Sequence, residues 1–133
     1  MASLDMGPLN RYRRLAREHT RATIDTLCET IADRGTKPEL EVFNDGHLNE
    51  VAGLLDRYDL DVPVYVNLIL GGGTLIPATP RNLLLLVDNL PDGTQLNTLA
   101  FGRHQLPLTT LGLIIGGHVR VGLEETSDIQ RAN

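Results

Sequence analysis

Residues 62–73, VPVYVNLILGGG, set the class of fold that this sequence encodes. The stretch is almost uniformly apolar, is rich in β-branched residues and runs into three glycines. A run of this kind is typical of a strand covered on both faces, because a strand with one face in water alternates apolar and polar residues. It therefore predicts a buried parallel strand that ends in a loop.

Turn and capping residues extend the prediction in both directions along the chain. Thr79 followed by Pro80 is typical of a helix start, whereas Gly35 and the turn at residues 91–93 are typical of element ends. Strands are expected at residues 2–6, 39–43, 62–70, 96–101 and 118–123, and helices at residues 12–33, 48–58, 79–90 and 107–115. Cys28 is expected to be buried on the first helix.

The strands and helices alternate as βαβαβαβαβ, which predicts an α/β fold with a parallel sheet and right-handed crossovers. Several strands carry polar residues on one face at a spacing of two, among them Glu39 and Glu41, then His118, Arg120 and Glu124. Charge on one face of several parallel strands is typical of a barrel interior. A flavodoxin-like open sheet is the alternative, but it offers no natural place for a buried Arg120–Glu124 pair on its last strand.

Composition and charge narrow the class of protein. The chain has 133 residues, 41% of them hydrophobic and 22% charged, which predicts one globular domain. The formal net charge of -5 disfavours nucleic acid and anionic membranes as partners. The single cysteine cannot form an internal disulfide. With no apolar run of about 18 residues and no secretory signal, the expected location is cytoplasmic.

Five segments, in order, resemble the beta-keto acid cleavage enzymes, whose founding activity is cleavage of 3-keto-5-aminohexanoate. The segments are ASLDMG at residues 2–7, KPELEVFNDGHL at 37–48, IPATPRNL at 76–83, GRHQLPL at 102–108 and GGHVRVGLEE at 116–125. They cover nearly the whole chain, and the resemblance rests on the five together rather than on any one of them.

The resemblance implies a (β/α)8 barrel with a divalent metal ion, usually zinc. The family exchanges acyl groups between a beta-keto acid and acetyl-CoA, giving acetoacetate and a new acyl-CoA. Glu124 matches a glutamate that ligates the metal, and Arg120 matches an arginine that assists acyl transfer. Glu125 stands where the family commonly has an aspartate of the catalytic machinery. These three residues are the expected metal ligand and catalytic residues.

The sequence also departs from the family. The His-x-His motif that supplies two metal ligands is absent, so metal binding by this chain alone is expected to be weak or nil. The resemblance makes residues 1–133 a single partial barrel domain that carries barrel strands 4 to 8. This domain would lack the first three βα units and the last helix. Open sheet edges then predict a homo-oligomer or a complementing chain.

Three residues are predicted to bind substrate. Glu41 points the same way as Glu39, nearer the active end of its strand, and either binds substrate or pairs with Arg103 or another barrel charge. Asn67 either hydrogen-bonds substrate or satisfies a neighbour. Arg103 follows a strand end, where barrel enzymes place their chemistry, and is expected to contact a carboxylate or the phosphates of acetyl-CoA.

Several roles stay open between function and structure. Arg120, predicted to share a strand face with Glu124 at about 13 Å, is either catalytic or part of a structural ion pair. His118 is expected to be a satisfied core histidine, and His47 follows the strand at residues 39–43 and could start the next helix. The whole chain is either part of an acyl transferase that works when completed, or a non-catalytic half-barrel remnant or binding module.

Overall fold

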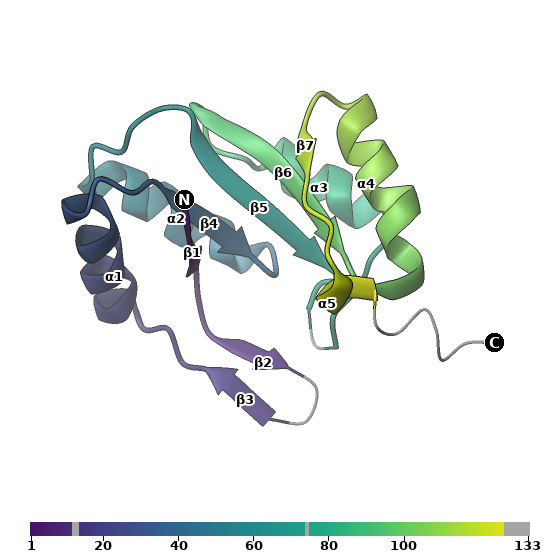
Figure 1. Cartoon of the computed structure of the whole chain (residues 1–133), viewed down its shortest axis with the longest axis horizontal. Helices are drawn as coiled ribbons and strands as arrows, with labels where there is room; N and C mark the ends of the chain where they lie inside the picture. Colours follow the sequence, from purple (N-terminus) through teal and green to yellow (C-terminus); the bar gives the residue numbers. More distant parts are fainter. Residues whose placement is uncertain (12–13, 74, 127–133) are drawn as a thin grey trace.

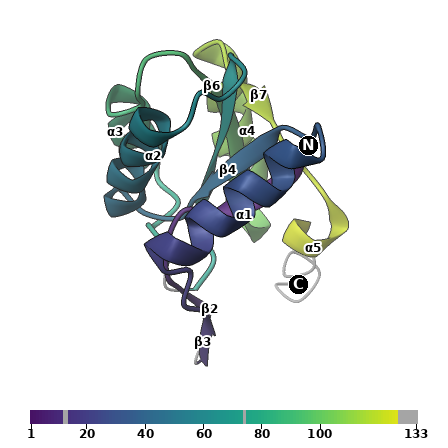
Figure 2. The same cartoon turned by 90° about the vertical axis from the view of Figure 1, so that its left-hand side faces the viewer.

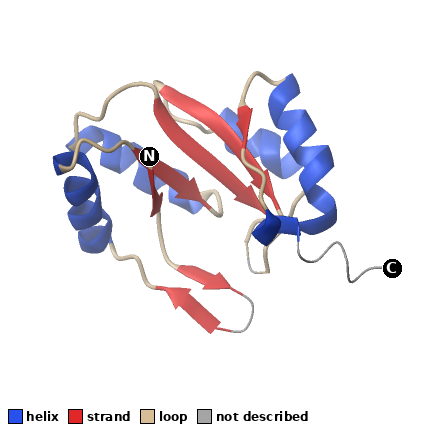
Figure 3. Ribbon diagram, viewed as in Figure 1, coloured by secondary structure: helices blue, strands red, loops and turns tan. Residues whose placement is uncertain are grey.

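The computed structural model describes residues 1–11, 14–73 and 75–126, and its main feature is a five-stranded parallel sheet. The strands are β1 (Ala2–Asp5), β4 (Pro38–Val42), β5 (Val64–Leu70), β6 (Thr94–Ala100) and β7 (His118–Val119), side by side in chain order (Figure 1). The connecting helices are α1 (Arg21–Asp33), α2 (Gly46–Arg57), α3 (Pro80–Asp88) and α4 (Gln105–Ile114) (Figure 3).

The strand order separates the two expected folds. A flavodoxin-like sheet reverses direction at a switch point, so its strand order differs from its chain order. Here each crossover moves the chain one strand in the same direction, which places all the helices on one face when crossovers are right-handed. The flavodoxin-like alternative is therefore wrong. The expectation of a partial (β/α) barrel is confirmed. The five strands form an open arc rather than a closed barrel, with β1 and β7 at the two edges of the sheet.

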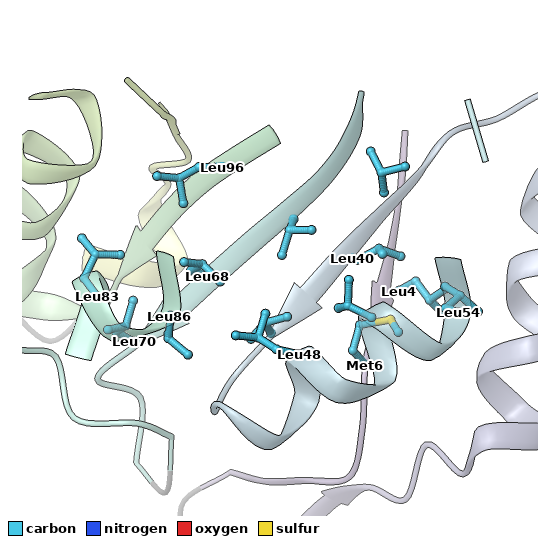
Figure 4. Close-up of a cluster of buried hydrophobic side chains, with 14 of the residues drawn as sticks. Leu4, Met6, Leu40, Leu48, Leu54, Leu68, Leu70, Leu83, Leu86 and Leu96 are labelled. Carbon is cyan, nitrogen blue, oxygen red and sulfur yellow. The ribbon is translucent and has the colours of Figure 1, made fainter. Parts of the chain in front are cut away.

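The main core lies between the sheet and the helices. Leu40, Val66 and Leu68 come from one face of the strands and are fully buried or nearly so (Figure 4). The helices contribute Ile24, Cys28, Leu48, Val51, Leu54, Leu83, Leu86 and Leu108 to the same cluster. Cys28 has an exposed fraction of 0%, so the prediction that it is buried is confirmed. None of the helices in the described ranges is long and apolar enough to cross a membrane.

The first helix is shorter than predicted. Helix α1 begins at Arg21, and Thr20 caps it by accepting a hydrogen bond from the backbone N–H of Thr23. The preceding segment forms an antiparallel hairpin of β2 (Leu9–Arg11) and β3 (Arg14–Arg17), which projects from the body (Figure 2). Residues 12 and 13 lie outside the described residues. The predicted helix at residues 14–20 is wrong, because the capping residue and the buried helical positions all lie at or after Thr20.

The last strand is also shorter than predicted. Strand β7 covers His118–Val119, and the chain turns into a short helix α5 (Leu123–Thr126) where a strand was expected to continue. Glu124 therefore does not share a strand face with Arg120, and the predicted Arg120–Glu124 pair on the last strand is wrong. Among the described residues, strand β7 is an edge strand that pairs with β6 alone.

Candidate active site

A row of polar side chains crosses the sheet on the face opposite the helices. Asp5 pairs in register with Glu41, Glu41 with Asn67, Asn67 with Asn97, and Asn97 with His118. Side chains alternate between the two faces of a strand, and the residues between these positions pack on the helices. The row therefore lies on the face that a closed barrel turns inward, called the inner face from here on.

An ion pair spans the inner face. Nη1 of Arg120, directly after β7, donates to Oε1 of Glu41 on β4 at 2.6 Å and lies 3.5 Å from Oε2 of Glu39. Strands β5 and β6 lie between the partners. With about 4.8 Å between neighbouring strands, three steps across a flat sheet would separate the two backbones by roughly 14 Å. The side chains meet because the sheet curls around its inner face.

The ion pair is half-buried and places one guanidinium against two carboxylates. The side chain of Arg120 is 38% exposed, whereas those of Glu39 and Glu41 are 11% and 10% exposed. Burial lowers the pKa of the Arg120 guanidinium, but the hydrogen bond to Glu41 and the charges of Glu41, Glu39 and Glu125 outweigh burial and raise this pKa. Arg120 is thus a permanent cation facing two carboxylates. The predicted alternative that Glu41 pairs with a charged residue of the barrel is therefore confirmed, with Arg120 rather than Arg103 as its partner.

Two amides lie beside the ion pair. Nδ2 of Asn97 donates to Oε1 of Glu39 at 2.8 Å. Asn67 has an exposed fraction of 0%, and within the described part of the chain neither of its amide atoms has a hydrogen-bond partner; the same holds for Oδ1 of Asn97. An unpaired buried amide costs about 1–3 kcal/mol of stability. Such a group is unusual in a folded protein.

Apolar side chains cover the inner face toward the C-terminal ends of the strands. This second cluster consists of Phe43, Ile69, Leu75 and Leu99, with Leu9 and Phe101 packed against it. Leu75 comes from the loop after β5, which is fixed by a 3.0 Å hydrogen bond from the N–H of Ile76 to the carbonyl of Phe43. A Cβ on Gly72 would lie 2.7 Å from the ring of Phe101, so this loop can pack closely only with glycine there. The polar row therefore lies beneath an apolar cover.

The contacts of Arg103 do not include the inner-face ion pair. It sits in the 3-10 helix Gly102–His104 after β6, its side chain is exposed, and its Nε lies 3.4 Å from Nε2 of His104. Among the described residues Arg103 forms no ion pair with Glu41. Its exposed position at a strand end leaves it accessible to a ligand, so its predicted role in substrate binding stays a prediction.

The two C-terminal glutamates differ in what the structure describes. Both lie in α5, which neighbours the 3-10 helix Gly102–His104, and the side chain of Glu124 lies outside the described part of the chain. Glu125 is 7% exposed, and a Cβ on Gly122 would lie 2.5 Å from its Oε2, so this carboxylate folds back over the glycine. The charge of Glu125 also acts on Arg120. Across the described residues, no three His, Cys, Asp or Glu side chains are grouped to hold a metal ion.

The predictions for the two histidines have different outcomes, since only that for His118 is wrong and His47 lies at the start of α2 as expected. His118 is exposed and lies beside Tyr65, with ring centroids 6.3 Å apart and ring planes tilted by 49°, so the expectation of a core histidine is wrong. The reason is its place on an edge strand. His47 is the second residue of α2 and is 7% exposed, where its Nδ1 accepts from the N–H of Phe43 at 3.4 Å. Burial lowers the pKa of His47 below its ordinary value.

Comparison of the sequence with known proteins shows to which family the chain belongs. Residues 1–133 match the family model of the beta-keto acid cleavage enzymes. The chain belongs to this family. It is 33% identical to the 3-keto-5-aminohexanoate cleavage enzyme of Acetoanaerobium sticklandii, over 98% of the chain and 48% of that protein. The enzyme of the same name from Fusobacterium nucleatum is 30% identical over 98% of the chain and 47% of that protein.

A more distant relative carries a different substrate name. The 3-dehydrocarnitine:acetyl-CoA trimethylamine transferase of Rhizobium meliloti is 25% identical over 94% of the chain and 42% of that protein. The chain thus spans about half the length of the curated relatives it matches. The predicted resemblance to the beta-keto acid cleavage enzymes is confirmed.

Sequence reasoning missed two inner-face residues of this beta-keto acid cleavage family member. Asn97 was not predicted, although TQLNTLA at residues 94–100 places Gln95 and Asn97 on one face at a spacing of two. Glu39 was passed over in favour of Glu41, yet it contacts both Arg120 and Asn97. Both contacts join residues of non-adjacent strands, so they depend on the curvature of the sheet, and a strand pattern alone does not report curvature.

Proposed function

We propose that residues 1–133 form the substrate-facing part of an enzyme that exchanges acyl groups between a beta-keto acid and acetyl-CoA, giving acetoacetate and an acyl-CoA. Family membership supports this proposal, as do relatives named for a beta-keto acid cleavage and for an acetyl-CoA transferase. The observation that carries it is Arg120, a charged guanidinium held on the inner face against Glu41.

Arg120 is proposed to act on the oxygen that gains negative charge during acyl transfer. A guanidinium offers charge-assisted donors in a fixed plane, and such donors stabilise a developing oxyanion when they are already in place. Glu125, whose charge also acts on Arg120, is proposed to tune or share this role.

The other predicted residues take binding roles in this proposal. Glu41 and Asn67 face the substrate on the inner face, and Arg103 holds a carboxylate or the phosphates of acetyl-CoA from the strand end. Glu124 is the proposed ligand for a zinc ion. The described residues alone do not form a ligand set for that ion, so its remaining ligands would have to come from other residues.

We further propose that this partial barrel domain acts only when the barrel is completed, by a second chain or by a longer chain that contains it. The open arc of five strands supports this, as does the match to about half of each relative. Completion would supply the three βα units and the final helix that a (β/α)8 barrel requires. A non-catalytic half-barrel remains the competing function, and the following experiment separates the two.

The test is a chimera in which residues 1–133 replace the matched half of the Acetoanaerobium sticklandii enzyme. With zinc, acetyl-CoA and 3-keto-5-aminohexanoate, the chimera should form acetoacetate, whereas residues 1–133 alone should not. Arg120→Ala should lower the rate by roughly 100-fold or more, in the range seen for loss of one oxyanion donor. Arg81→Ala, at an exposed position of α3, is the matched control and should leave the rate unchanged.

Two results would contradict the proposal. A folded chimera that forms no acetoacetate would favour the non-catalytic half-barrel. A chimera in which Arg120→Ala is as active as its parent would remove Arg120 from the reaction. Circular dichroism and the melting temperature of each chimera establish that it is folded before its rate is interpreted.

A further inference from the structure

Glu39 is the deeper of two carboxylates that β4 places on the inner face. It lies two residues before Glu41, so both side chains leave the same face of the strand, about 6.6 Å apart along it. Barrel enzymes carry out their chemistry at the C-terminal ends of their strands. Glu41 is therefore the carboxylate nearer to a substrate, and Glu39 lies behind it with an exposed fraction of 8%.

Asn97 fixes the carboxylate of Glu39. Nδ2 of Asn97 donates to Oε1 of Glu39 at 2.8 Å, and this hydrogen bond is buried. It ties β6 to β4 across the intervening strand β5. With Oε1 held in this way, rotation of the carboxylate is restricted, and Oε2 lies 3.5 Å from Nη1 of Arg120. Asn97 thus determines where Glu39 presents its second oxygen to the guanidinium.

Arg120 contacts the two carboxylates unequally. Its Nη1 donates to Oε1 of Glu41 at 2.6 Å, whereas its distance of 3.5 Å to Oε2 of Glu39 is that of an ion pair without a hydrogen bond. The proposed function assigns Glu41 to the substrate, so a bound substrate competes with Arg120 for this carboxylate. Glu39 is then the carboxylate that holds Arg120 without contacting the substrate.

Burial makes the contact between Glu39 and Arg120 costly to lose. A buried carboxylate is unfavourable unless it is paired or hydrogen-bonded. Within the described part of the chain, Arg120 is the cation at ion-pair distance from Glu39, and Asn97 supplies a donor but no charge. The guanidinium has five donors in one plane, so it can keep Glu39 and still direct donors toward a substrate oxygen.

We propose that Glu39, held by Asn97, is a positioning residue that keeps the Arg120 guanidinium at the reacting oxygen while Glu41 engages the substrate. The inference rests on the proposed function, because it takes Arg120 as the group that stabilises negative charge during acyl transfer. It adds Glu39 and Asn97 as residues that act through Arg120 and do not contact the substrate. The competing role is a purely structural one, a polar link between β4 and β6.

The test uses the completed barrel, the chimera that carries residues 1–133, and measures kcat and KM separately. Glu39→Gln keeps the shape of the side chain and an oxygen that accepts from Asn97, but it removes the charge that attracts Arg120. The variant should lower kcat by roughly tenfold or more, because a displacement of about 1 Å can cost up to about 100-fold. KM for the keto acid and for acetyl-CoA should stay unchanged, since Glu39 contacts neither. Asp56→Asn, at an exposed position of α2, is the matched control and should keep both constants.

A second background separates positioning from a structural role. If Glu39 acts through Arg120, Glu39→Gln should cause no further fall in kcat in a chimera that already carries Arg120→Ala. A structural role would instead lower kcat by the same factor with and without Arg120.

The same comparison tests Asn97. Asn97→Leu should lower kcat by less than Glu39→Gln does, because Oε1 of Glu39 loses its donor but the charge remains. It should leave kcat unchanged where Glu39→Gln is already present. Asn49→Leu, on the exposed side of α2, is the matched control and should keep kcat. If circular dichroism shows that Glu39→Gln does not fold, Asn97→Leu is compared with and without Arg120→Ala instead, and it should lower kcat only where Arg120 is present.

The outcomes separate this proposal from the proposed function. An active chimera whose kcat Glu39→Gln leaves unchanged, or lowers equally with and without Arg120, overturns the positioning role while the proposed function stands. A rise in KM at unchanged kcat would make Glu39 a substrate-binding residue and would also overturn it. If Asn97→Leu still lowers kcat beside Glu39→Gln, the assignment of Asn97 is wrong. If the folded chimera forms no acetoacetate, the proposed function fails and the positioning role fails with it.

Discussion

At the scale of single residues, His47 connects two loops near the ends of β1 and β4. Its Nδ1 accepts from the N–H of Phe43, and its Nε2 lies 3.4 Å from Nδ2 of Asn44. Gly7 passes so close that a Cβ there would lie 2.7 Å from Nε2. Burial lowers the pKa of His47 below 6.5, so the folded chain favours the neutral ring, whose Nδ1 can accept from Phe43.

This pKa shift gives stability a pH dependence with a definite sign. Because the unfolded chain binds a proton at His47 more readily than the folded chain, the contribution of His47 is complete above pH 6.5 and is lost as the pH falls below that value. The free energy of unfolding, measured with urea at pH 7.5 and pH 5.5, should drop more in the wild type than in His47→Gln. The exposed His118→Gln is the control and should keep the wild-type drop; equal drops in wild type and His47→Gln would contradict the assignment.

Some of the site residues could be predicted from the sequence pattern and others could not. The alternation in residues 39–43 and the lone polar Asn67 in an apolar strand were enough to place Glu41 and Asn67 on the inner face. The partner of Arg120 was not predictable, because Glu41 is distant in sequence and lies three strands away in the sheet. Glu125 could be predicted only from the family pattern. Its burial depends on the turn at Gly122, which no strand pattern reports.

At the scale of elements, helix α1 shows why a boundary was misplaced. Charged residues before Thr20 are compatible with a helix surface, so the helix was predicted from residue 12. The structure forms a hairpin there and starts the helix at Arg21, with Thr20 as its cap. The buried positions Ile24 and Cys28 are four residues apart and define the helix face, and they lie after the cap.

The sign of one substitution tests this boundary. Thr20→Ala should lower the free energy of unfolding by about 1 kcal/mol, because the cap of α1 is lost. If the helix instead ran through residue 20, the same change would place alanine in a helix interior and would raise stability slightly. Thr26→Ala, within the exposed side of α1, is the control and should change stability by less than about 0.5 kcal/mol. Chemical denaturation of the two variants measures both values.

At the scale of the whole molecule, the regular alternation of strands and helices was readable because each strand pattern and each cap is local. The order of the strands did not follow from the crossover rule, which a flavodoxin-like sheet also obeys; a barrel order was expected from the family resemblance. The curvature of the sheet was not readable, since it emerges from the twist and stagger of five strands together. That curvature shortens the path between Arg120, which follows one edge strand, and Glu41 near the other edge, where the two side chains lie 2.6 Å apart.

The most direct test of this account is a double-mutant cycle across the inner face. Arg120→Ala, Glu41→Ala and the double variant are compared with wild type by their free energies of unfolding, and Arg103→Ala with Glu41→Ala is the matched control cycle. The account predicts a coupling energy of about 1–3 kcal/mol for Arg120 and Glu41, and about zero for Arg103 and Glu41. A coupling near zero for Arg120 and Glu41 would mean that the sheet does not curl to join them, and would contradict both the barrel arc and the site built on it.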